Sequence, residues 1–211
     1  MMLQLREVAL LRDGHAVLCD LTMSLAPGQA VLIKGENGSG KTTLLRTICG
    51  WRPSHGGSIT WRGIPLDAAR ENLRSELAYL GHQDGLHDDL SVRENISWLC
   101  AMAGETPGHS DLERALLEMD LRGVADKPAR ALSRGQRRRT ALTRFLLIRK
   151  PLWVLDEPLA ALDAQGQQRF RSCVMRHLHA GGLALLSCHT DSWPHHSSLR
   201  SLYLPARPRA I

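Results

Sequence analysis

A glycine-rich segment between an apolar run and a helix-like stretch limits the possible folds of this chain more than any other feature of the sequence. Residues Gly35 to Thr42 read GENGSGKT and fit the pattern G-x-x-x-x-G-K-[ST], after AVLI (30–33) and before TLLRTIC. Glycines let backbone N–H groups curl around a phosphate at the positive end of the following helix. Lys41 can reach the outer phosphates of a nucleotide, and the Thr42 hydroxyl can bind Mg²⁺. The predicted nucleotide-binding residues are Gly35, Glu36, Asn37, Gly38, Ser39, Gly40, Lys41, Thr42 and Thr43.

Short apolar runs bounded by turn residues recur along the chain. Runs without polar alternation are typical of strands buried on both faces, as in a parallel sheet covered by helices. Between Asp84 and Leu132 the pattern changes to helical spacing, interrupted by the breaker-rich stretch GETPGHS. The sequence therefore predicts an α/β chain with an inserted helical lobe. The apolar runs are AVLI (30–33), LAYL (77–80), LWVL (152–155) and LALLS (183–187).

Two acidic residues, Asp156 and Glu157, directly follow the apolar run LWVL. Acids at the end of a buried strand are costly unless they face a cation or water at the edge of the sheet. Asp156 suits the ligand shell of Mg²⁺, and Glu157 suits polarisation of an attacking water. A strand-end turn with two solvated acids is the alternative, and the phosphate-binding loop in the same chain weighs against it.

Composition narrows the possible partners and compartment. The net charge of +6 comes from 23 Arg and 4 Lys residues that are spread along the whole chain, without aromatic residues between them to stack on bases. We therefore expect no nucleic-acid partner. No apolar run reaches the ~20 residues of a membrane span, and the N-terminal stretch lacks the pattern of a secretory signal. The five cysteines have no metal-ligand spacing, so we interpret them as small apolar residues of a reducing, cytosolic compartment.

Two polar stretches are interpreted as solvated surface. The segment after Ser192 is rich in Pro, His, Ser and Arg, which favours an irregular edge of the fold. His195 and His196 within it leave a metal site open, although a solvated loop is favoured. Arg137 and Arg138, in a run of three arginines, are typical of the wet face of a helix.

Further motifs follow the phosphate-binding loop in an order that resembles the ATP-binding domains of ABC transporters. The resemblance runs from about Leu3 to His189, and Arg139 and Arg144 stand where that family usually has arginines. LSRGQ is similar to the family's LSGGQ signature, Gln83 to its Q-loop glutamine, Asp163 to its D-loop aspartate, and His189 to its switch histidine. The signature residues are Leu132, Ser133, Arg134, Gly135 and Gln136.

This resemblance implies a P-loop NTPase fold of the ABC type over residues 1–211, as a single domain. A mainly parallel core sheet flanked by helices would be joined by an N-terminal antiparallel β part and an inserted helical subdomain. The implied bounds are 1–83 and 133–191 for the α/β core lobe, 84–132 for the helical subdomain and 192–211 for a C-terminal tail.

The resemblance also implies a mechanism of ATP hydrolysis with Mg²⁺. Two copies would dock head to tail, so that Ser133 and Gly135 of one copy close over the ATP held by the other. His189 would hold the γ-phosphate and the water in place, and Gln83 would sense Mg²⁺ and move the helical lobe. The implied catalytic residues are Glu157, His189, Gln83 and Lys41, and the implied Mg²⁺ ligands are Thr42, Gln83 and Asp156.

Two positions depart from the family's pattern. Arg134 replaces the first signature glycine, and its side chain either crowds the opposite ATP or points outward, which we favour. Where the family has an aromatic residue against adenine, this chain has Leu11, Arg12 and Asp13. Arg12 could stack on the base through its guanidinium plane, or the adenine could be held loosely.

Finer strings resemble one group within the family. YLGHQDGLHDDLSVRENISWL, LSRGQRRRTALTRFLL and PLWVLDEPLAALD are similar to the ATP-binding subunits of cytochrome c maturation haem exporters. The resemblance implies a peripheral protein on the cytoplasmic face of the inner membrane, paired with a permease subunit. ATP turnover would then drive haem export or release of a haem-loaded periplasmic chaperone, which would be an indirect partner.

Two alternatives remain open from the sequence. An ATPase subunit of another small-substrate ABC transporter would share every ATP-site residue and differ in its permease. A soluble ABC assembly ATPase, as in iron–sulfur cluster building, would leave no membrane-bound fraction.

Overall fold

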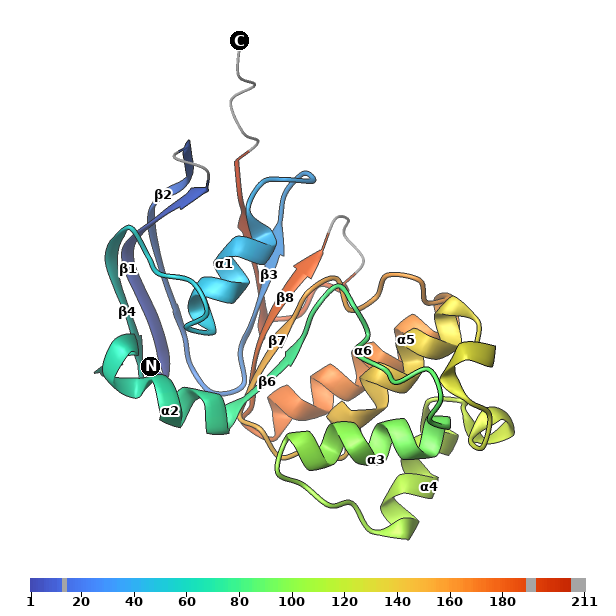
Figure 1. Ribbon diagram of the computed structural model, residues 1–211. Coiled ribbons are helices and arrows are strands. Elements are labelled where there is room, and N and C mark those ends of the chain that lie inside the picture. Colours follow the sequence, from blue (N-terminus) through green and yellow to red (C-terminus); the bar gives the residue numbers. More distant parts are fainter. Residues whose placement is uncertain (13–14, 189–192, 206–211) are drawn as a thin grey trace. The chain divides into compact units, whose positions relative to one another are not determined.

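The computed structural model describes residues 1–12, 15–188 and 193–205, and the chain divides into two compact units (Figure 1). Unit 1 comprises 1–79, 150–157 and 177–211, and unit 2 comprises 80–149 and 158–176. The strands are β1 (Leu3–Arg12), β2 (His15–Leu25), β3 (Ala30–Lys34), β4 (Gly56–Trp61), β5 (Ile64–Pro65), β6 (Leu77–Leu80), β7 (Leu152–Leu155), β8 (Leu183–Cys188) and β9 (Leu199–Tyr203). The α-helices are α1 (Lys41–Ile48), α2 (Leu66–Glu76), α3 (Val92–Met102), α4 (His109–Glu118), α5 (Arg134–Thr143) and α6 (Ala164–His179).

Two sheets are formed by these strands. One is antiparallel, in the order β2-β1-β4-β5, and the other has the order β6-β7-β8-β3-β9. In the second sheet β3 pairs with β8 and β9, and β7 pairs with β8, all in parallel. Every residue of β7 and β8 is buried, as the continuously apolar runs predict. The predicted α/β fold with a mainly parallel sheet and an N-terminal antiparallel part is confirmed.

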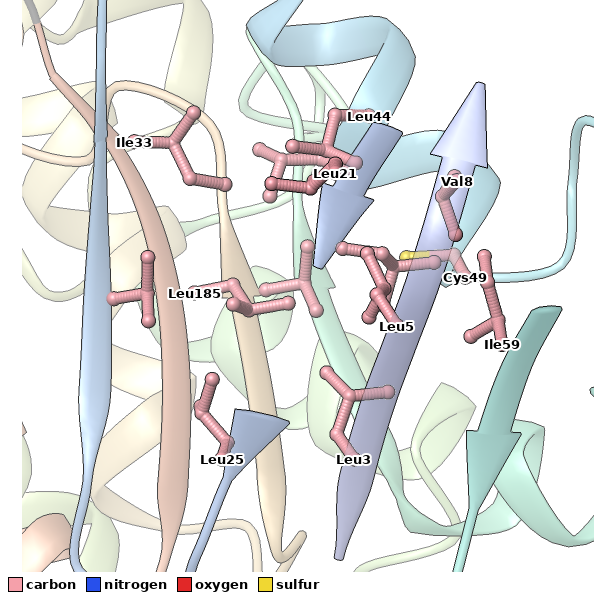
Figure 2. Close-up of a cluster of buried hydrophobic side chains, with 14 of the residues drawn as sticks. Leu3, Leu5, Val8, Leu21, Leu25, Ile33, Leu44, Cys49, Ile59 and Leu185 are labelled. Carbon is pink, nitrogen blue, oxygen red and sulfur yellow. The ribbon is translucent and has the colours of Figure 1, made fainter. Parts of the chain in front are cut away.

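Side chains from both sheets and from α1 form one core within unit 1 (Figure 2). β1 contributes Leu3 and Leu5 and then Val8 and Leu10, so the alternation of buried residues changes phase in the middle of the strand. A register shift lies between Leu5 and Val8, where Glu7 has a φ of 51°. A bulge of this kind lets one long strand keep its apolar side chains on the core side of a bent sheet.

Unit 2 is built mainly from helices α3, α4 and α5 and most of α6, with short 3₁₀ turns at Arg122–Val124, Ala129–Ala131 and Arg144–Leu146. The helix α3 begins at a capping box, in which the Ser91 hydroxyl accepts from Glu94 N–H and the Glu94 carboxylate accepts from Ser91 N–H. Helix α5 groups with unit 2, whereas the bounds implied by the sequence place it in the α/β core. Those bounds stay a prediction.

The C-terminal segment corrects one interpretation. The irregular edge expected after Ser192 is wrong for β9, because that strand pairs with β3 along its whole length. Leu204 follows β9, is buried, and donates its N–H to Lys34 O at 2.8 Å. Leu202 and Leu204 are apolar residues at alternate positions, a pattern typical of a β-strand, within a stretch of mostly polar residues.

In the part of the chain that the structure describes, no helix is long and apolar enough to cross a membrane.

Candidate nucleotide-binding site

The loop between β3 and α1 has a backbone that requires glycine. Gly35, Gly38 and Gly40 have φ values of 153°, 83° and 99°, a region that side chains with a Cβ rarely adopt. A Cβ on Gly40 would lie 2.1 Å from Val17 Cγ1, and one on Gly35 would lie 2.6 Å from Ser39 Oγ. Both backbone angle and space therefore exclude larger residues at Gly35 and Gly40, and the loop curls as the glycine pattern predicts.

Lys41 and Ser39 point polar groups at this loop. Lys41 begins α1, and its Nζ donates to Gly35 O at 2.7 Å and to Glu36 O at 3.0 Å. The Ser39 hydroxyl is buried, and it has no hydrogen-bond partner among the described residues. A buried polar atom of this kind is costly unless a ligand satisfies it. An ammonium group, an orphaned hydroxyl and a curled backbone fit the phosphates of a nucleotide.

A chain of hydrogen bonds links the loop to the two acids after β7. The Thr42 hydroxyl donates to Asp156 Oδ2 at 2.7 Å, and the Ser187 hydroxyl donates to Asp156 Oδ1 at 2.5 Å. The N–H of Glu157 donates to Ser187 Oγ at 2.8 Å. Asp156 is therefore held by one hydroxyl on each carboxylate oxygen, and Ser187 couples it to the backbone of Glu157.

Burial and strain single out the same acids. Asp156 is only 1% exposed, whereas Glu157 is half-buried. Glu157 has a φ of 49°, which costs on the order of 1–3 kcal/mol in a residue with a Cβ and is typical of functional sites. Mg²⁺ prefers oxygen ligands and is commonly held by one or two carboxylates together with substrate phosphates. Thr42 and Asp156 fit that requirement.

Tyr79, in the same unit, interacts electrostatically with Asp156. Tyr79 of β6 packs edge-on against Trp51, with the ring centroids 4.5 Å apart. Burial raises the pKa of the Tyr79 hydroxyl, a hydrogen bond with Arg46 opposes that shift, and the negative charge of Asp156 adds to it. Tyr79 is therefore a neutral neighbour of the acid.

In unit 2 the signature segment forms the start of α5. The Ser133 hydroxyl accepts from Gln136 N–H at 3.2 Å, and Gln136 Oε1 accepts from Ser133 N–H at 2.9 Å. A Cβ on Gly135 would lie 3.1 Å from Ala161 O, so the signature glycine allows close approach to the turn before Asp163. Asp163 Oδ1 accepts from Gly166 N–H at 2.8 Å and caps α6. The signature and the D-loop are thus neighbours within one unit.

The expectation that Arg137 and Arg138 lie on a solvent-exposed face of a helix is wrong. Arg138 is 4% exposed, and Arg137 forms an ion pair with Asp88 at 2.7 Å. Arg139 Nη1 donates to Asp120 Oδ2 at 2.7 Å, so all three consecutive arginines make contacts within unit 2. Burial lowers the pKa of Arg144, which follows α5, to about 10. An arginine side chain can be buried when its planar guanidinium group donates hydrogen bonds to nearby acceptors. A run of basic residues in the sequence does not show whether such acceptors are present.

The remaining predicted site residues are characterised by their exposure alone, or lie outside the described residues. Gln83 and Arg134 are both exposed. His189 lies outside the described residues, as does Asp13. Leu11 is 36% exposed on β1.

Sequence reasoning misses Ser187 and Arg138. A signal for Ser187 exists, because it is the single hydroxyl residue in the otherwise apolar run LALLS at the end of a buried strand. No comparable signal marks Arg138, because Gly81, Asp84 and Pro158, which accept from it, lie far from it in the chain.

Comparison with known proteins agrees with this geometry. A sequence model of the ABC transporter family matches residues 18–160. The chain is 41% identical over 187 residues to the cytochrome c biogenesis ATP-binding export protein CcmA 2 of Cupriavidus metallidurans, covering 89% of each chain. It is 36% identical to the CcmA protein of Vibrio cholerae, covering 96% of this chain and 98% of the relative.

Solved structures agree in fold. A putative ABC transporter ATP-binding protein from Pyrococcus furiosus aligns over 97% of this chain and 98% of its own, with a TM-score of 0.84 at 24% identity. The ATP-binding subunit of another ABC transporter aligns over 90% of this chain and 80% of its own, with a TM-score of 0.76 at 27% identity. The chain therefore belongs to the ABC transporter family, as an ATP-binding and ATP-hydrolysing member.

Proposed function

We propose that this protein is the ATP-binding subunit of an ABC transporter complex in c-type cytochrome biogenesis. The hydrogen-bonded chain from Thr42 through Asp156 and Ser187 to Glu157 carries the hydrolytic part of the proposal. The relatives named as cytochrome c biogenesis export proteins support its biological setting.

In this proposal the loop of residues 35–43 binds the phosphates of ATP through its backbone N–H groups and Lys41. Thr42, Asp156 and Gln83 hold Mg²⁺, which neutralises charge on the phosphate oxygens when it is bound. Glu157 orients and polarises the attacking water, because its backbone is fixed by Ser187 while its side chain remains half-buried at the end of β7.

The second half of each site comes from another copy of the chain, docked head to tail. Ser133 caps the N-terminus of α5 with its hydroxyl, at the end where the helix dipole stabilises a negative charge. Together with the close-packed Gly135 it supplies donors to the ATP of the opposite copy. Asp163 lies beside them in the same unit. The sequence resemblance alone supports His189 as the switch histidine that would hold the γ-phosphate and the water.

The motion of this pair drives a permease subunit in the inner membrane. The protein would be peripheral on the cytoplasmic face, and ATP turnover would power haem export or release of a haem-loaded periplasmic chaperone.

The proposed ATP hydrolysis and ATP-driven dimerisation are tested with Glu157→Gln. The amide cannot accept a proton or polarise water as a carboxylate does, so hydrolysis should fall by ~10²-fold or more while ATP binding persists. Size-exclusion chromatography under saturating ATP should show a dimer of the variant. A variant that hydrolyses ATP normally, or that stays monomeric under saturating ATP, contradicts this assignment.

The proposed role in c-type cytochrome biogenesis is tested in the native host with Lys41→Ala. Loss of covalently bound haem on c-type cytochromes, restored by the wild-type gene, supports the proposal. Normal c-type cytochromes with the variant present at normal levels would point to another substrate. Fractionation of the lysate separates a transporter subunit from an assembly ATPase, because only the former should be found with membranes.

A further inference from the structure

One buried guanidinium group joins two distant segments of unit 2 to helix α5. Arg138 Nη1 donates to Gly81 O at 3.3 Å and to Asp84 Oδ1 at 2.9 Å, and Arg138 Nε donates to Pro158 O at 3.3 Å. Gly81 and Asp84 lie on either side of Gln83, and Pro158 directly follows Glu157 in the chain. Arg138 itself lies in α5, five residues after the signature serine.

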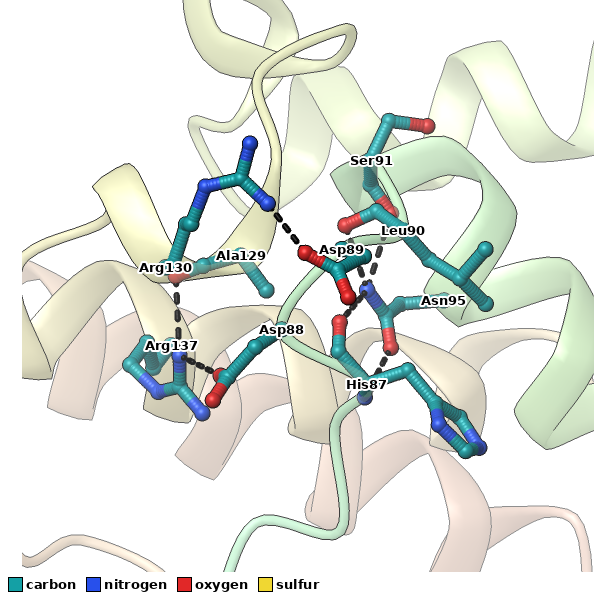
Figure 3. Close-up of polar contacts among 9 residues, drawn as sticks. All are labelled: His87, Asp88, Asp89, Leu90, Ser91, Asn95, Ala129, Arg130 and Arg137. Atoms are coloured by element: carbon teal, nitrogen blue, oxygen red, sulfur yellow. Dashed lines mark hydrogen bonds and ion pairs between the residues drawn. The ribbon is translucent and has the colours of Figure 1, made fainter.

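The Arg138–Asp84 ion pair is more buried than the neighbouring pairs Arg137–Asp88 and Arg130–Asp89. Arg138 and Asp84 have side chains that are 5% and 20% exposed, whereas Asp88, which pairs with Arg137, is 65% exposed. Asp89 pairs with Arg130 and is more exposed still. Figure 3 shows these outer pairs.

The segment between Gln83 and α3 is also held by a buried amide. Asn95 is fully buried, and its side chain bonds to the backbone of His87, Leu90 and Ser91 (Figure 3). The stretch that follows Gln83 is therefore a fixed element of unit 2. Its position relative to α5 is fixed by the Arg–Asp pairs together with backbone hydrogen bonds from Ala129 N–H to Leu90 O and from Arg130 N–H to Asp88 O.

Stability alone is a weak reason for such a pair. Removing two charges from water costs free energy that their attraction only partly offsets, and apolar residues of similar volume often stabilise a protein as well or better. The fork of arginine does what an apolar residue cannot, because it fixes the directions of several acceptors at once.

We propose that Arg138 is a positioning residue for ATP hydrolysis, which rests on the function proposed above. It holds the backbone on both sides of Gln83, and the carbonyl of Pro158, in one arrangement with the helix that carries Ser133. Gln83 and the segment that follows Glu157 would thereby keep their places relative to the signature serine.

Arg138→Met tests this proposal, because methionine is close in length and cannot bond to any of the three acceptors. Misplacement of reacting groups by about 1 Å can cost ~10²-fold in rate, so we expect kcat to fall by ~10- to 100-fold. The KM for ATP should change little, because the phosphate-binding loop lies in unit 1. The half-saturating Mg²⁺ concentration should rise, because Gln83 is a proposed Mg²⁺ ligand.

Arg137→Met is the matched control, since it breaks an Arg–Asp pair on the same helix without touching the residues that flank Gln83. Hydrogen exchange of the nucleotide-free protein gives an independent readout. Amides in 81–84 and 159–161 should exchange faster in Arg138→Met and not in Arg137→Met. Asp84→Asn is the milder variant, and its effect on kcat should not add to that of Arg138→Met, because both remove the same contact.

Two results would overturn the proposal. One is an Arg138→Met enzyme with the kcat and Mg²⁺ dependence of Arg137→Met. The other is a parallel loss of kcat, ATP affinity and thermal stability, which would give Arg138 a structural role only. If wild-type protein does not hydrolyse ATP, or Glu157→Gln leaves hydrolysis intact, the function proposed above fails instead.

Discussion

The Thr42 hydroxyl donates to Asp156 Oδ2 across 2.7 Å, although 114 positions separate the two residues. The contact exists because the strands that precede them, β3 and β7, lie on either side of β8 in the same sheet. Ser187 of β8 bonds to the other oxygen of Asp156. Three parallel strands thus bring Thr42, Ser187 and Asp156 together at their carboxyl ends.

Replacing Thr42 tests the Mg²⁺ assignment. Thr42→Ala removes a hydroxyl that we expect to bind the metal and leaves Asp156 with one fewer donor, so kcat/KM should fall by ~10²-fold. Thr42→Ser retains the hydroxyl and should keep most of the activity. ATPase assays over a range of Mg²⁺ concentrations measure both, and equal activity of the two variants would contradict the assignment.

Ser187 should matter for rate more than for binding. Ser187→Ala leaves one Asp156 oxygen and the Glu157 N–H without this partner, and a hydrogen bond to a charged group contributes ~1.5–3 kcal/mol. We expect kcat to fall at least ~10-fold, with ATP affinity close to that of the wild type. Titration with a fluorescent ATP analogue separates the two effects. Unchanged turnover would mean that Ser187 has no part in holding the acids.

The phosphate-binding loop should reject a methyl group at Gly40. Gly40→Ala combines a left-handed backbone, which costs ~1–2 kcal/mol, with a Cβ that would lie 2.1 Å from Val17 Cγ1. We expect ATP binding to be lost or strongly weakened. Val17→Ala in the same chain removes the clash and should restore part of the binding. Gly38→Ala is a milder comparison, because nothing lies within 4 Å of the place that its methyl group would take.

His177 should make stability depend on pH. Its ring stacks on Trp153 at 3.8 Å, its Nε2 lies 3.1 Å from Leu183 O, and burial lowers its pKa. The unfolded chain therefore binds the proton more readily, so the free energy of unfolding should decrease as the pH falls below about 6.5. The slope from this group is at most ~1.4 kcal/mol per pH unit.

His177→Phe retains an aromatic ring against Trp153 and cannot titrate. Urea unfolding at several pH values between neutral and mildly acidic should show a smaller decrease for this variant than for the wild type. Parallel curves for the two proteins would show that His177 does not titrate differently in the folded state.

The C-terminal strand should support the phosphate-binding loop. Leu204 is buried in the core of unit 1, and its carbonyl oxygen lies 3.0 Å from where a Cβ on Gly35 would be. Leu204→Ala should lower the free energy of unfolding by ~2–5 kcal/mol and weaken ATP binding. Tyr203→Ala is the control, because that residue is 68% exposed. Equal thermal stability of the two variants would contradict the packing role.

Local patterns are sufficient for much of the fold. The glycine pattern at 35–42 predicts a loop between a strand and a helix, and β3, β7 and β8 coincide with apolar runs. These features are readable because backbone angle and burial act on neighbouring residues. The sequence does not predict β9, because pairing with β3 rather than its own composition makes it a strand.

The amino-acid sequence specifies which chemical groups this protein carries and their order along the chain, from Lys41 and Thr42 to Asp156 and Glu157. Which of these groups contact one another follows from the folded arrangement of the chain. Ser187 reaches Asp156 through the order of parallel strands, and Arg138 is buried because two distant segments turn acceptors toward it. Such contacts depend on burial and on strand order, which act between residues far apart in the chain.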